Sequence, residues 1–312
     1  MAGISGSSRP LGLGREHYCL LVLQDEWLSL ASAHADRTRP WVEDRLARRS
    51  RGDKHAVYDF LFDYYPYSPA KLSTWHPGYG VVLEGPEAAR QYTHDAYTQN
   101  SSGVTADIGW LKPREPRLKM AIRLLQGTLS RQPMTGCFAL HEWAMVYGLG
   151  QDEIRHPYLP LRVSPETIRD TVDSVGLRCT HIDAYRFYTD EALPLNATVP
   201  TRERQPDDEQ PGCLHAAMDC YKIAGWFSPL TSSDLVADAF KLAVMARELD
   251  MRSSPYDVSE YGMTAIEVNT SEGRKAYANE QQRVIDASAP VRLALLDALL
   301  NLESALSELS PS

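Results

Sequence analysis

The sequence predicts a mainly α-helical α+β protein: a single helical domain that carries a small β-sheet. Apolar residues recur at helical spacing in several long segments, whereas only two short segments have the pattern of a strand. No internal repeat divides the chain, and 312 residues are enough to enclose one substantial core. We therefore expect a disordered, Gly- and Ser-rich tail at residues 1–14 and one domain over residues 15–312.

The helices follow from this periodicity, taken in chain order. Residues 16–51 have the helical pattern and end in a basic turn before Gly52, which predicts a helical hairpin whose last turn suits the helix dipole. Further amphipathic segments predict helices at residues 115–131, 138–148, 165–175, 214–227, 231–251 and about 271–309.

Two segments are predicted to be extended. Residues 81–83 are a short apolar run that follows a loop rich in Pro and Gly. Residues 177–188 alternate with period two, which would place His181 and Asp183 on one face of a strand. The polar stretch 196–210 is the one plausible linker, and we interpret it as a loop within a single domain because candidate metal ligands lie on both sides of it.

Composition favours a small-molecule partner. The net charge is −9 and the isoelectric point is near 5.5, whereas a protein bound to duplex DNA usually carries a basic face, so a nucleic-acid partner is not expected. No apolar run approaches the roughly 18 residues of a membrane span, and residues 18–23 lack the basic start of a signal peptide. Five cysteines without a C-x-x-C pair indicate a cytoplasmic protein with reduced thiols.

Three histidines lie in short runs of the same chemical make-up, each with a thiol before the imidazole and a carboxylate after it. The runs are Cys137 to Glu142 around His141, Cys179 to Asp183 around His181, and Cys213 to Asp219 around His215. Imidazole and carboxylate together are the ligands that a divalent first-row metal such as iron prefers. The sequence therefore predicts one metal ion bound by the three imidazoles.

The carboxylates in these runs have different predicted roles. His181 and Asp183 would form the local half of a two-histidine, one-carboxylate triad on the predicted strand, so Asp183 is the candidate fourth ligand. His215 and Asp219 lie four residues apart and share a helix face, which makes Asp219 a ligand or the acceptor of a hydrogen bond from one.

Glu142 follows His141 directly and would point about 100° away from it around a helix, so it is better placed to orient a ligand or to accept a proton. Two other interpretations remain open. The histidines can be hydrogen-bonded core residues, or the three neighbouring thiols can join them in a structural zinc site.

An aromatic loop precedes the first predicted strand, with Tyr64, Tyr65 and Tyr67 within four residues. It is either a packed turn or the lining of a pocket for a flat, polar ring, because tyrosine offers an apolar face and a hydrogen-bonding tip. Lys222 adds a cation one turn beyond Asp219 and is a further candidate for substrate binding.

Several blocks resemble an actinobacterial family whose members usually carry the label 3-methyladenine DNA glycosylase. The blocks are FDYYPYSPAKL at 62–72, WHPGYGVVLEG at 75–85, GCFALHEWAMVY at 136–147, CTHIDAYRF at 179–187, EQPGCLHAAMD at 209–219 and RELDMRSSPYD at 247–257. The similarity extends over nearly the whole chain from about residue 16. The same family contains a non-heme iron enzyme that uses dioxygen to rearrange the pyridine ring of a C-nucleoside into a 1,3-oxazine in antibiotic biosynthesis.

This resemblance implies a mononuclear iron(II) site, a nucleoside substrate and O₂, and oxidative ring opening. In that reaction Glu142 or Asp219 would manage protons, and the tyrosine loop with Arg186 or Arg252 would hold the ring and the ribose. The alternatives are a glycosylase that releases alkylated bases from DNA and a non-catalytic protein stabilised by zinc.

Overall fold

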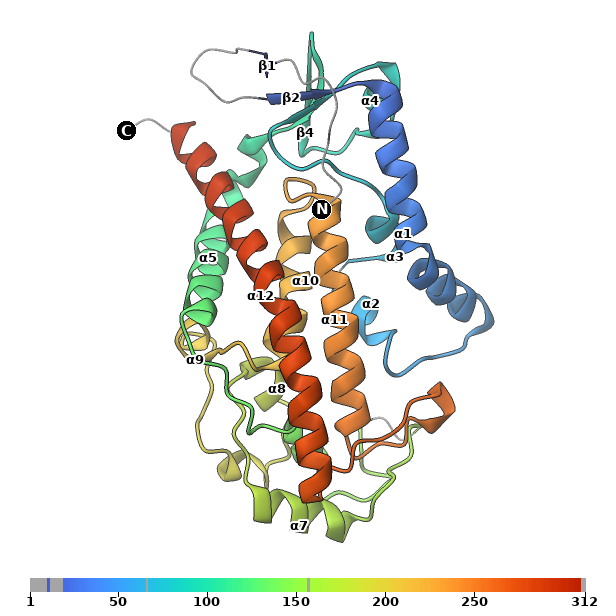
Figure 1. Cartoon of the computed structure of the whole chain (residues 1–312), viewed down its shortest axis with the longest axis vertical. Helices are drawn as coiled ribbons and strands as arrows, with labels where there is room; N and C mark the ends of the chain where they lie inside the picture. The colour runs from blue at the N-terminus through green and yellow to red at the C-terminus, as the bar shows by residue number, and fades with distance from the viewer. Residues whose placement is uncertain (1–9, 12–18, 66, 156–157, 310–312) are drawn as a thin grey trace.

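Three long helices form the centre of the molecule, and a small sheet lies at one end of them (Figure 1). The computed structural model describes residues 10–11, 19–65, 67–155 and 158–309. The central helices are α10 (Leu214–Phe227), α11 (Ser233–Ser253) and α12 (Ser271–Glu308). Most residues of α10 are buried, including the polar His215 and Asp219, because other elements pack around it. The predicted mainly helical α+β fold is confirmed.

The sheet has five strands in the order β1-β2-β3-β5-β4. They are β1 (Pro10–Leu11), β2 (Cys19–Val22), β3 (Val81–Leu83), β4 (Tyr97–Asn100) and β5 (Gly103–Ala106). Only the β2–β3 pair is parallel. A separate small core forms where Trp27 of α1 (Gln24–Arg51) packs against the sheet, and its indole donates to Glu84 O at 2.9 Å.

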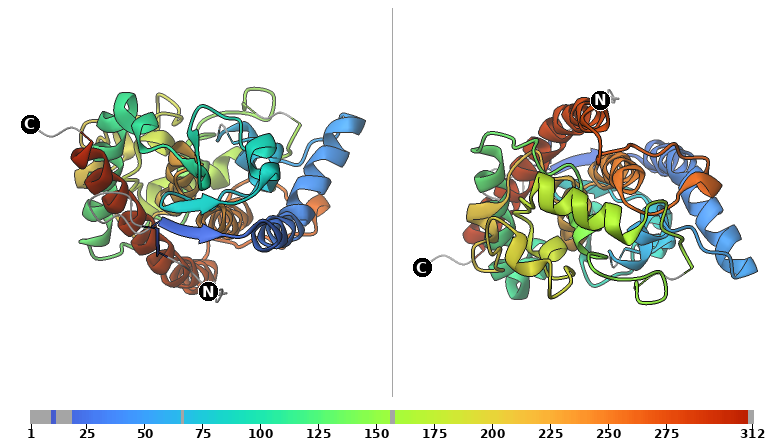
Figure 2. Two further views of the ribbon diagram at one scale, coloured as in Figure 1. Left: turned by 90° about the horizontal axis from the view of Figure 1, so that it is seen from above. Right: turned by 90° about the horizontal axis from the view of Figure 1, so that it is seen from below.

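Shorter elements surround the central helices. They are α2 (Phe60–Asp63), α3 (Pro69–Ser73), α4 (Pro86–Gln91), η1 (Ile108–Arg114), α5 (Glu115–Leu129), α6 (Leu140–Ala144), α7 (Pro165–Val175), α8 (Ile182–Tyr185), η2 (Leu193–Leu195), α9 (Gln205–Asp208) and η3 (Ser259–Tyr261). Figure 2 shows the molecule from both ends, and α7 crosses the end opposite the sheet. At that end α6, α8 and the start of α10 meet the last turns of α11, and this convergence builds the site described below.

Most helix predictions are confirmed. Residues 165–175 and 214–227 match α7 and α10, and α5, α11 and α12 begin and end within two residues of their expected limits. Side-chain caps fix several of these ends: Ser164 accepts from the backbone N–H of Thr167 at the start of α7, and Thr270 accepts from that of Gly273 at the start of α12. The strand at 81–83 is β3.

The predicted hairpin at 16–51 is wrong. Residues 24–51 form one continuous helix, α1, which runs through Pro40 and follows strand β2. The helix ends at Gly52, which adopts the left-handed region at φ 76°. The basic last turn is present as expected.

The predicted strand at 177–188 is also wrong. Only its first residues are extended, and His181 is the N-cap of the short helix α8. The amide side chain of Asn196 takes the place of a partner strand: it accepts from the N–H of Cys179 at 2.8 Å and donates to the carbonyl of Cys179 at 2.9 Å. A period-two pattern cannot distinguish such a clamped segment from a true strand.

Three other expectations differ in part. The helix expected at 138–148 is limited to α6, because Phe138 and Ala139 adopt left-handed conformations at φ 50° and 56°. The stretch 196–210, interpreted as a loop within the domain, contains the short helix α9, and Gln205, Glu209 and Gln210 in it are buried. Of the predicted disordered tail at 1–14, only Pro10–Leu11 is described, as strand β1, and the rest lies outside the described residues.

None of the helices within the described ranges is long and apolar enough to cross a membrane.

Candidate metal centre

The three predicted histidines lie side by side at the end of the central helices opposite the sheet. His141 comes from α6, His181 from the N-cap of α8 and His215 from the first turn of α10. The ring centroid of His215 is 4.6 Å from that of His141 and 5.2 Å from that of His181. All three side chains are buried. Residues 74 positions apart in the sequence thus meet in one buried cluster.

The potential ligand atoms separate into two triads instead of one three-histidine site. The first triad is His141, His215 and Asp250, and the second is His181, Glu209 and Asp219; within each, the ligand atoms lie within 4.8 Å of one another. The histidines are therefore divided between two sites, and each site includes a carboxylate that the sequence analysis did not identify as a ligand.

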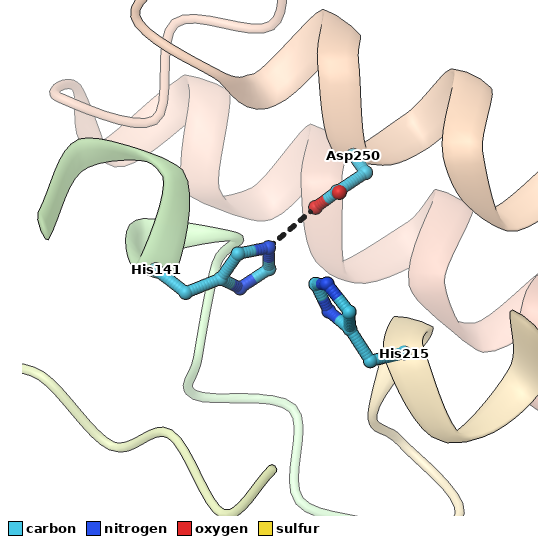
Figure 3. A group of neighbouring side chains, drawn as sticks. All are labelled: His141, His215 and Asp250. Carbon is cyan, nitrogen blue, oxygen red and sulfur yellow. Dashed lines mark ion pairs between the residues drawn. The ribbon is translucent and has the colours of Figure 1, made fainter. Parts of the chain in front are cut away.

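The first triad converges on a common point (Figure 3). His141 Nε2 lies 2.8 Å from Asp250 Oδ1, yet the angles are not those of a hydrogen bond, and both atoms stay without a hydrogen-bond partner among the described residues. Two ligands in adjacent positions around a metal at about 2.1 Å are about 3.0 Å apart. The close, misaligned approach of these buried atoms therefore fits two ligands of one ion better than it fits a hydrogen-bonded pair.

The backbone around His141 is held in an unusual conformation. The two consecutive left-handed residues Phe138 and Ala139 turn the chain sharply before α6, at a cost of order 1–3 kcal/mol each. On the other side of His141, the indole of Trp143 donates to Ser253 O at 2.8 Å. This bond ties α6 to the end of α11, which is the helix that carries Asp250, and so keeps the two ligands in register.

Asp250 is oriented by a buried arginine. Arg247 Nη1 contacts Asp250 Oδ2 at 3.1 Å and Glu142 Oε1 at 3.0 Å, which leaves Asp250 Oδ1 for the histidines. Burial acts to raise the pKa of Asp250, but His141 outweighs it and holds that pKa well below the usual range. For Glu142, burial and the charge of Asp250 raise the pKa, and Arg247 opposes them.

The two imidazoles of this triad differ in their preferred charge. Burial acts to lower the pKa of His141, but the carboxylate of Asp250 raises it well above the ordinary value. Burial and the neighbouring His141 lower the pKa of His215 well below its usual range. His215 is therefore a neutral imidazole, the form in which histidine binds metals, and its buried Nδ1 has no hydrogen-bond partner in the part of the chain that is described.

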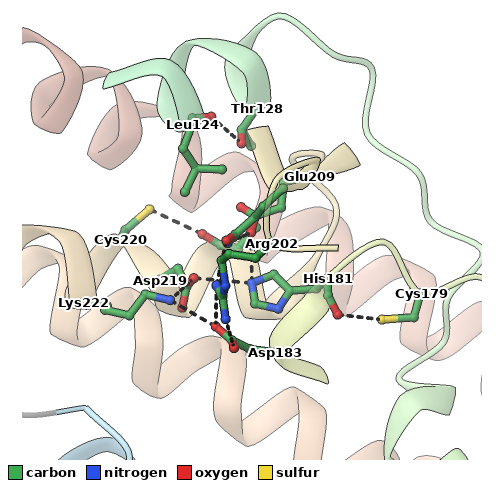
Figure 4. Close-up of polar contacts among 12 residues, drawn as sticks. Leu124, Thr128, Cys179, His181, Asp183, Arg202, Glu209, Asp219, Cys220 and Lys222 are labelled. Atoms are coloured by element: carbon green, nitrogen blue, oxygen red, sulfur yellow. Dashed lines mark hydrogen bonds and ion pairs between the residues drawn. The ribbon is translucent and has the colours of Figure 1, made fainter. Parts of the chain in front are cut away.

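The second triad lies deeper and is already surrounded by charges (Figure 4). His181 Nε2 is 3.1 Å from Glu209 Oε1 and 3.3 Å from Asp219 Oδ2. Burial acts to lower the pKa of His181, but Glu209 and Asp219 together raise it to about 9. Lys222 Nζ forms an ion pair with Asp219 at the same Oδ2 atom. Asp219, expected as a ligand or as an acceptor beside one, thus contacts a histidine other than His215.

Asp183, the predicted carboxylate ligand, contacts cations instead of the histidines. It pairs with Arg202, with Lys222 Nζ at 3.5 Å and with Arg186 Nε at 3.3 Å. The reason is the helical turn that replaces the predicted strand: from a helix, side chains two residues apart point in different directions, so Asp183 turns away from His181. Burial acts to raise its pKa, and the hydrogen bonds from Arg202 lower it below the usual range.

A narrow pocket adjoins the first triad. His141 and His215 line it, together with the thiols Cys137, Cys179 and Cys213 and the amide of Gln281. Cys137 Sγ is 3.9 Å from His141 Nδ1. Burial raises the pKa of Cys179 to about 11 and that of Cys213 well above the usual range. Burial thus disfavours the thiolate form of both cysteines.

The residues predicted to bind substrate lie in different places. The Tyr64 hydroxyl accepts from Arg186 Nη2 at 3.3 Å near the surface. Tyr67 packs against the far end of α10, where its hydroxyl pairs with Ser228 at 3.1 Å. Arg252 donates to Thr264 O at 2.9 Å and lines a separate surface pocket. Neither Tyr67 nor Arg252 is part of the histidine cluster.

Tyr65 is the most deeply buried tyrosine of the loop. Its side chain is buried, and its hydroxyl has no hydrogen-bond partner within the described ranges. Burial and then Asp219 raise the pKa of Tyr65 well above the usual range, while Arg247 acts to lower it. The Tyr65 ring packs against those of Tyr64 and Tyr221, with centroid distances of 5.0 and 5.7 Å. Lys222, also predicted for substrate, is engaged by Asp219 and Asp183.

Sequence reasoning missed Asp250, Glu209 and Arg247. A signal for each was present, since Glu209 begins the block that contains His215, and Arg247 and Asp250 lie three residues apart on one helix face. Neither carboxylate is close in sequence to the histidine that it contacts, so the pairing depends on tertiary structure.

Searches against family models, curated proteins and solved structures found no match for the chain.

Proposed function

We propose that the chain is a mononuclear non-heme iron enzyme that uses dioxygen to open and rearrange the heteroaromatic ring of a C-nucleoside. The first triad is the proposed iron site. The observation that supports it is the convergence of two buried imidazoles and one carboxylate whose facing atoms have no hydrogen-bond partner in the described part of the chain. Two histidines and one carboxylate with open positions are the ligand set of non-heme iron(II) oxygenases.

The protein's own contribution is positioning and exclusion of water. Iron(II) would supply Lewis acidity and one-electron chemistry with dioxygen. Arg247 fixes the carboxylate of Asp250 so that one oxygen faces the histidines. The burial of both imidazoles keeps bulk water from the site and strengthens its electrostatic interactions.

The narrow pocket beside the first triad is lined by groups that can hydrogen-bond to a polar ring, which favours such a ring as the substrate. Gln281 lines it, is fully buried, and has an Oε1 atom without a hydrogen-bond partner among the residues described, so this oxygen can accept from a ring hydroxyl or N–H. Arg178 lies at the exposed rim and can donate to ribose oxygens. Because the pocket is narrow, binding of a ring requires rim side chains such as Arg178 to move.

Oxygen uptake and iron content test the proposal together. The wild type, reconstituted anaerobically with iron(II), should consume O₂ when a dihydroxypyridine C-nucleoside is added. Asp250→Asn should lose both the iron and the uptake, whereas the control Asp183→Asn, which alters the carboxylate outside both triads, should keep the iron.

Three results would contradict the proposal. They are iron retained in full by Asp250→Asn, purified protein that holds zinc tightly and consumes no oxygen, and release of bases from alkylated DNA without metal.

A further inference from the structure

We propose that His181, Glu209 and Asp219 bind a second divalent cation, so that the buried cluster holds two metal ions. This inference goes beyond the proposed mononuclear site and depends on a different set of ligands. The three residues come from separate segments: the N-cap of α8, the residue after α9 and the second turn of α10. All three are buried, with side-chain exposures of 0, 2 and 3%.

The contacts around His181 have the spacing of ligands around a cation. Its Nε2 atom faces two carboxylate oxygens, at 3.1 Å in Glu209 and 3.3 Å in Asp219. A single N–H can point at only one of them, and only the Asp219 contact has hydrogen-bond geometry. The two distances are close to the spacing of about 3.0 Å between adjacent ligands of a metal bound at about 2.1 Å. A metal ion at this point would contact both oxygens as well as the nitrogen.

The ion pairs around the second triad are unevenly shared between its carboxylates. Lys222 contacts Asp219, while Lys222, Arg202 and Arg186 all contact Asp183, which lies outside the triad. Among the described residues, the ion pair of Glu209 is with His181. A buried carboxylate is costly unless its charge is compensated. A divalent ion ligated by His181 Nε2 would compensate Glu209 directly, while Lys222 keeps its contact with Asp183.

The two triads are close enough to belong to one site. His215 of the first triad and Asp219 of the second lie four residues apart on α10, which places their Cβ atoms about 5–6 Å apart on one helix face. The ring of His215 also lies within 5.2 Å of that of His181. Two carboxylates and one imidazole are an oxygen-rich set, which suits Mn²⁺ or Fe²⁺.

Mn²⁺ binding to the whole chain tests this inference. We expect two Mn²⁺ ions per wild-type chain after dialysis and metal analysis, and one each in Asp219→Asn and Asp250→Asn. The control Asp208→Asn, which removes a carboxylate paired with Arg204 one residue before Glu209, should keep two. Circular dichroism verifies that each variant is folded.

The outcomes separate the two proposals. One ion in the wild type that is lost in Asp250→Asn but kept in Asp219→Asn would overturn the second site and leave the proposed function intact. One ion that is lost only in Asp219→Asn would support the second site and overturn the iron assignment. If Asp219→Asn does not fold, electron paramagnetic resonance of the Mn²⁺-loaded wild type decides: a pair of ions about a helical turn apart broadens the spectrum, and the resolved six-line signal of isolated Mn²⁺ would overturn the proposal.

Discussion

Replacing Arg247 with methionine tests whether this side chain holds the metal-binding carboxylate in place. Arg247 is buried and contacts both Asp250 and Glu142 at about 3 Å, and its guanidinium carbon lies 4.2 Å from the ring centroid of Phe60. Methionine fills a similar space without the charge, so two buried carboxylates lose their shared cation. Removing one partner from such a buried network costs about 3–5 kcal/mol.

This cost converts into a measurable change in melting temperature. An unfolding entropy of about 2.1 cal/mol/K per residue gives about 0.66 kcal/mol/K for 312 residues, so we expect metal-free Arg247→Met to melt about 5–8 °C below the wild type. The loss should shrink in Mn²⁺, because an ion bound by Asp250 replaces part of the missing positive charge and stabilises the folded state.

The matched control is Arg252→Met on the same helix. Among the described residues, Arg252 donates a single hydrogen bond, to the carbonyl of Thr264, so its loss should cost about 1 kcal/mol or less. Thermal unfolding monitored by circular dichroism gives both values. Equal melting temperatures for the two variants would refute the role assigned to Arg247.

Three further changes probe other parts of the molecule. Burial lowers the pKa of His76 to about 4, so the folded state disfavours the protonated imidazole and loses stability as the pH falls below about 6.5. Relative to His76→Gln, the free energy of unfolding of the wild type should fall by about 3 kcal/mol between pH 7 and pH 4. A difference between the two proteins that does not change with pH would contradict this. Tyr65→Phe removes a buried hydroxyl that has no hydrogen-bond partner among the described residues. The free energy of unfolding measured in urea should therefore change by no more than about 1 kcal/mol, while oxygen uptake falls. Unchanged uptake would exclude the phenol from the reaction. Gly273→Ala would place a Cβ 1.9 Å from the carbonyl oxygen of Glu267. The free energy of unfolding should fall by about 1–3 kcal/mol in the same assay. A variant as stable as the wild type would show that the backbone at this position moves to accept the methyl group.

Helices with a clear apolar pattern and a capping residue could be predicted from the sequence. Residues 165–175 and 214–227 match α7 and α10 because their periodicity and their boundary residues agree. The failures involve features that local pattern does not encode. Residues 177–180 are clamped by the side chain of Asn196, and α1 continues through Pro40.

The candidate site shows the same limit. The chemical make-up of three short runs identified His141, His181 and His215, and the structure places their rings side by side. Their division between two triads was not predictable, since Asp250 and Glu209 reach the histidines from other segments of the chain. The choice of Asp183 as a ligand depended on a strand that is a helical turn in the structure.

Anomalous diffraction at the iron edge, from crystals grown anaerobically with iron(II), would locate the bound ion. We expect a peak between Nε2 of His141, a ring nitrogen of His215 and Oδ1 of Asp250. Iron bound by the pocket thiols or only at the surface, with no density among these three side chains, would contradict this expectation.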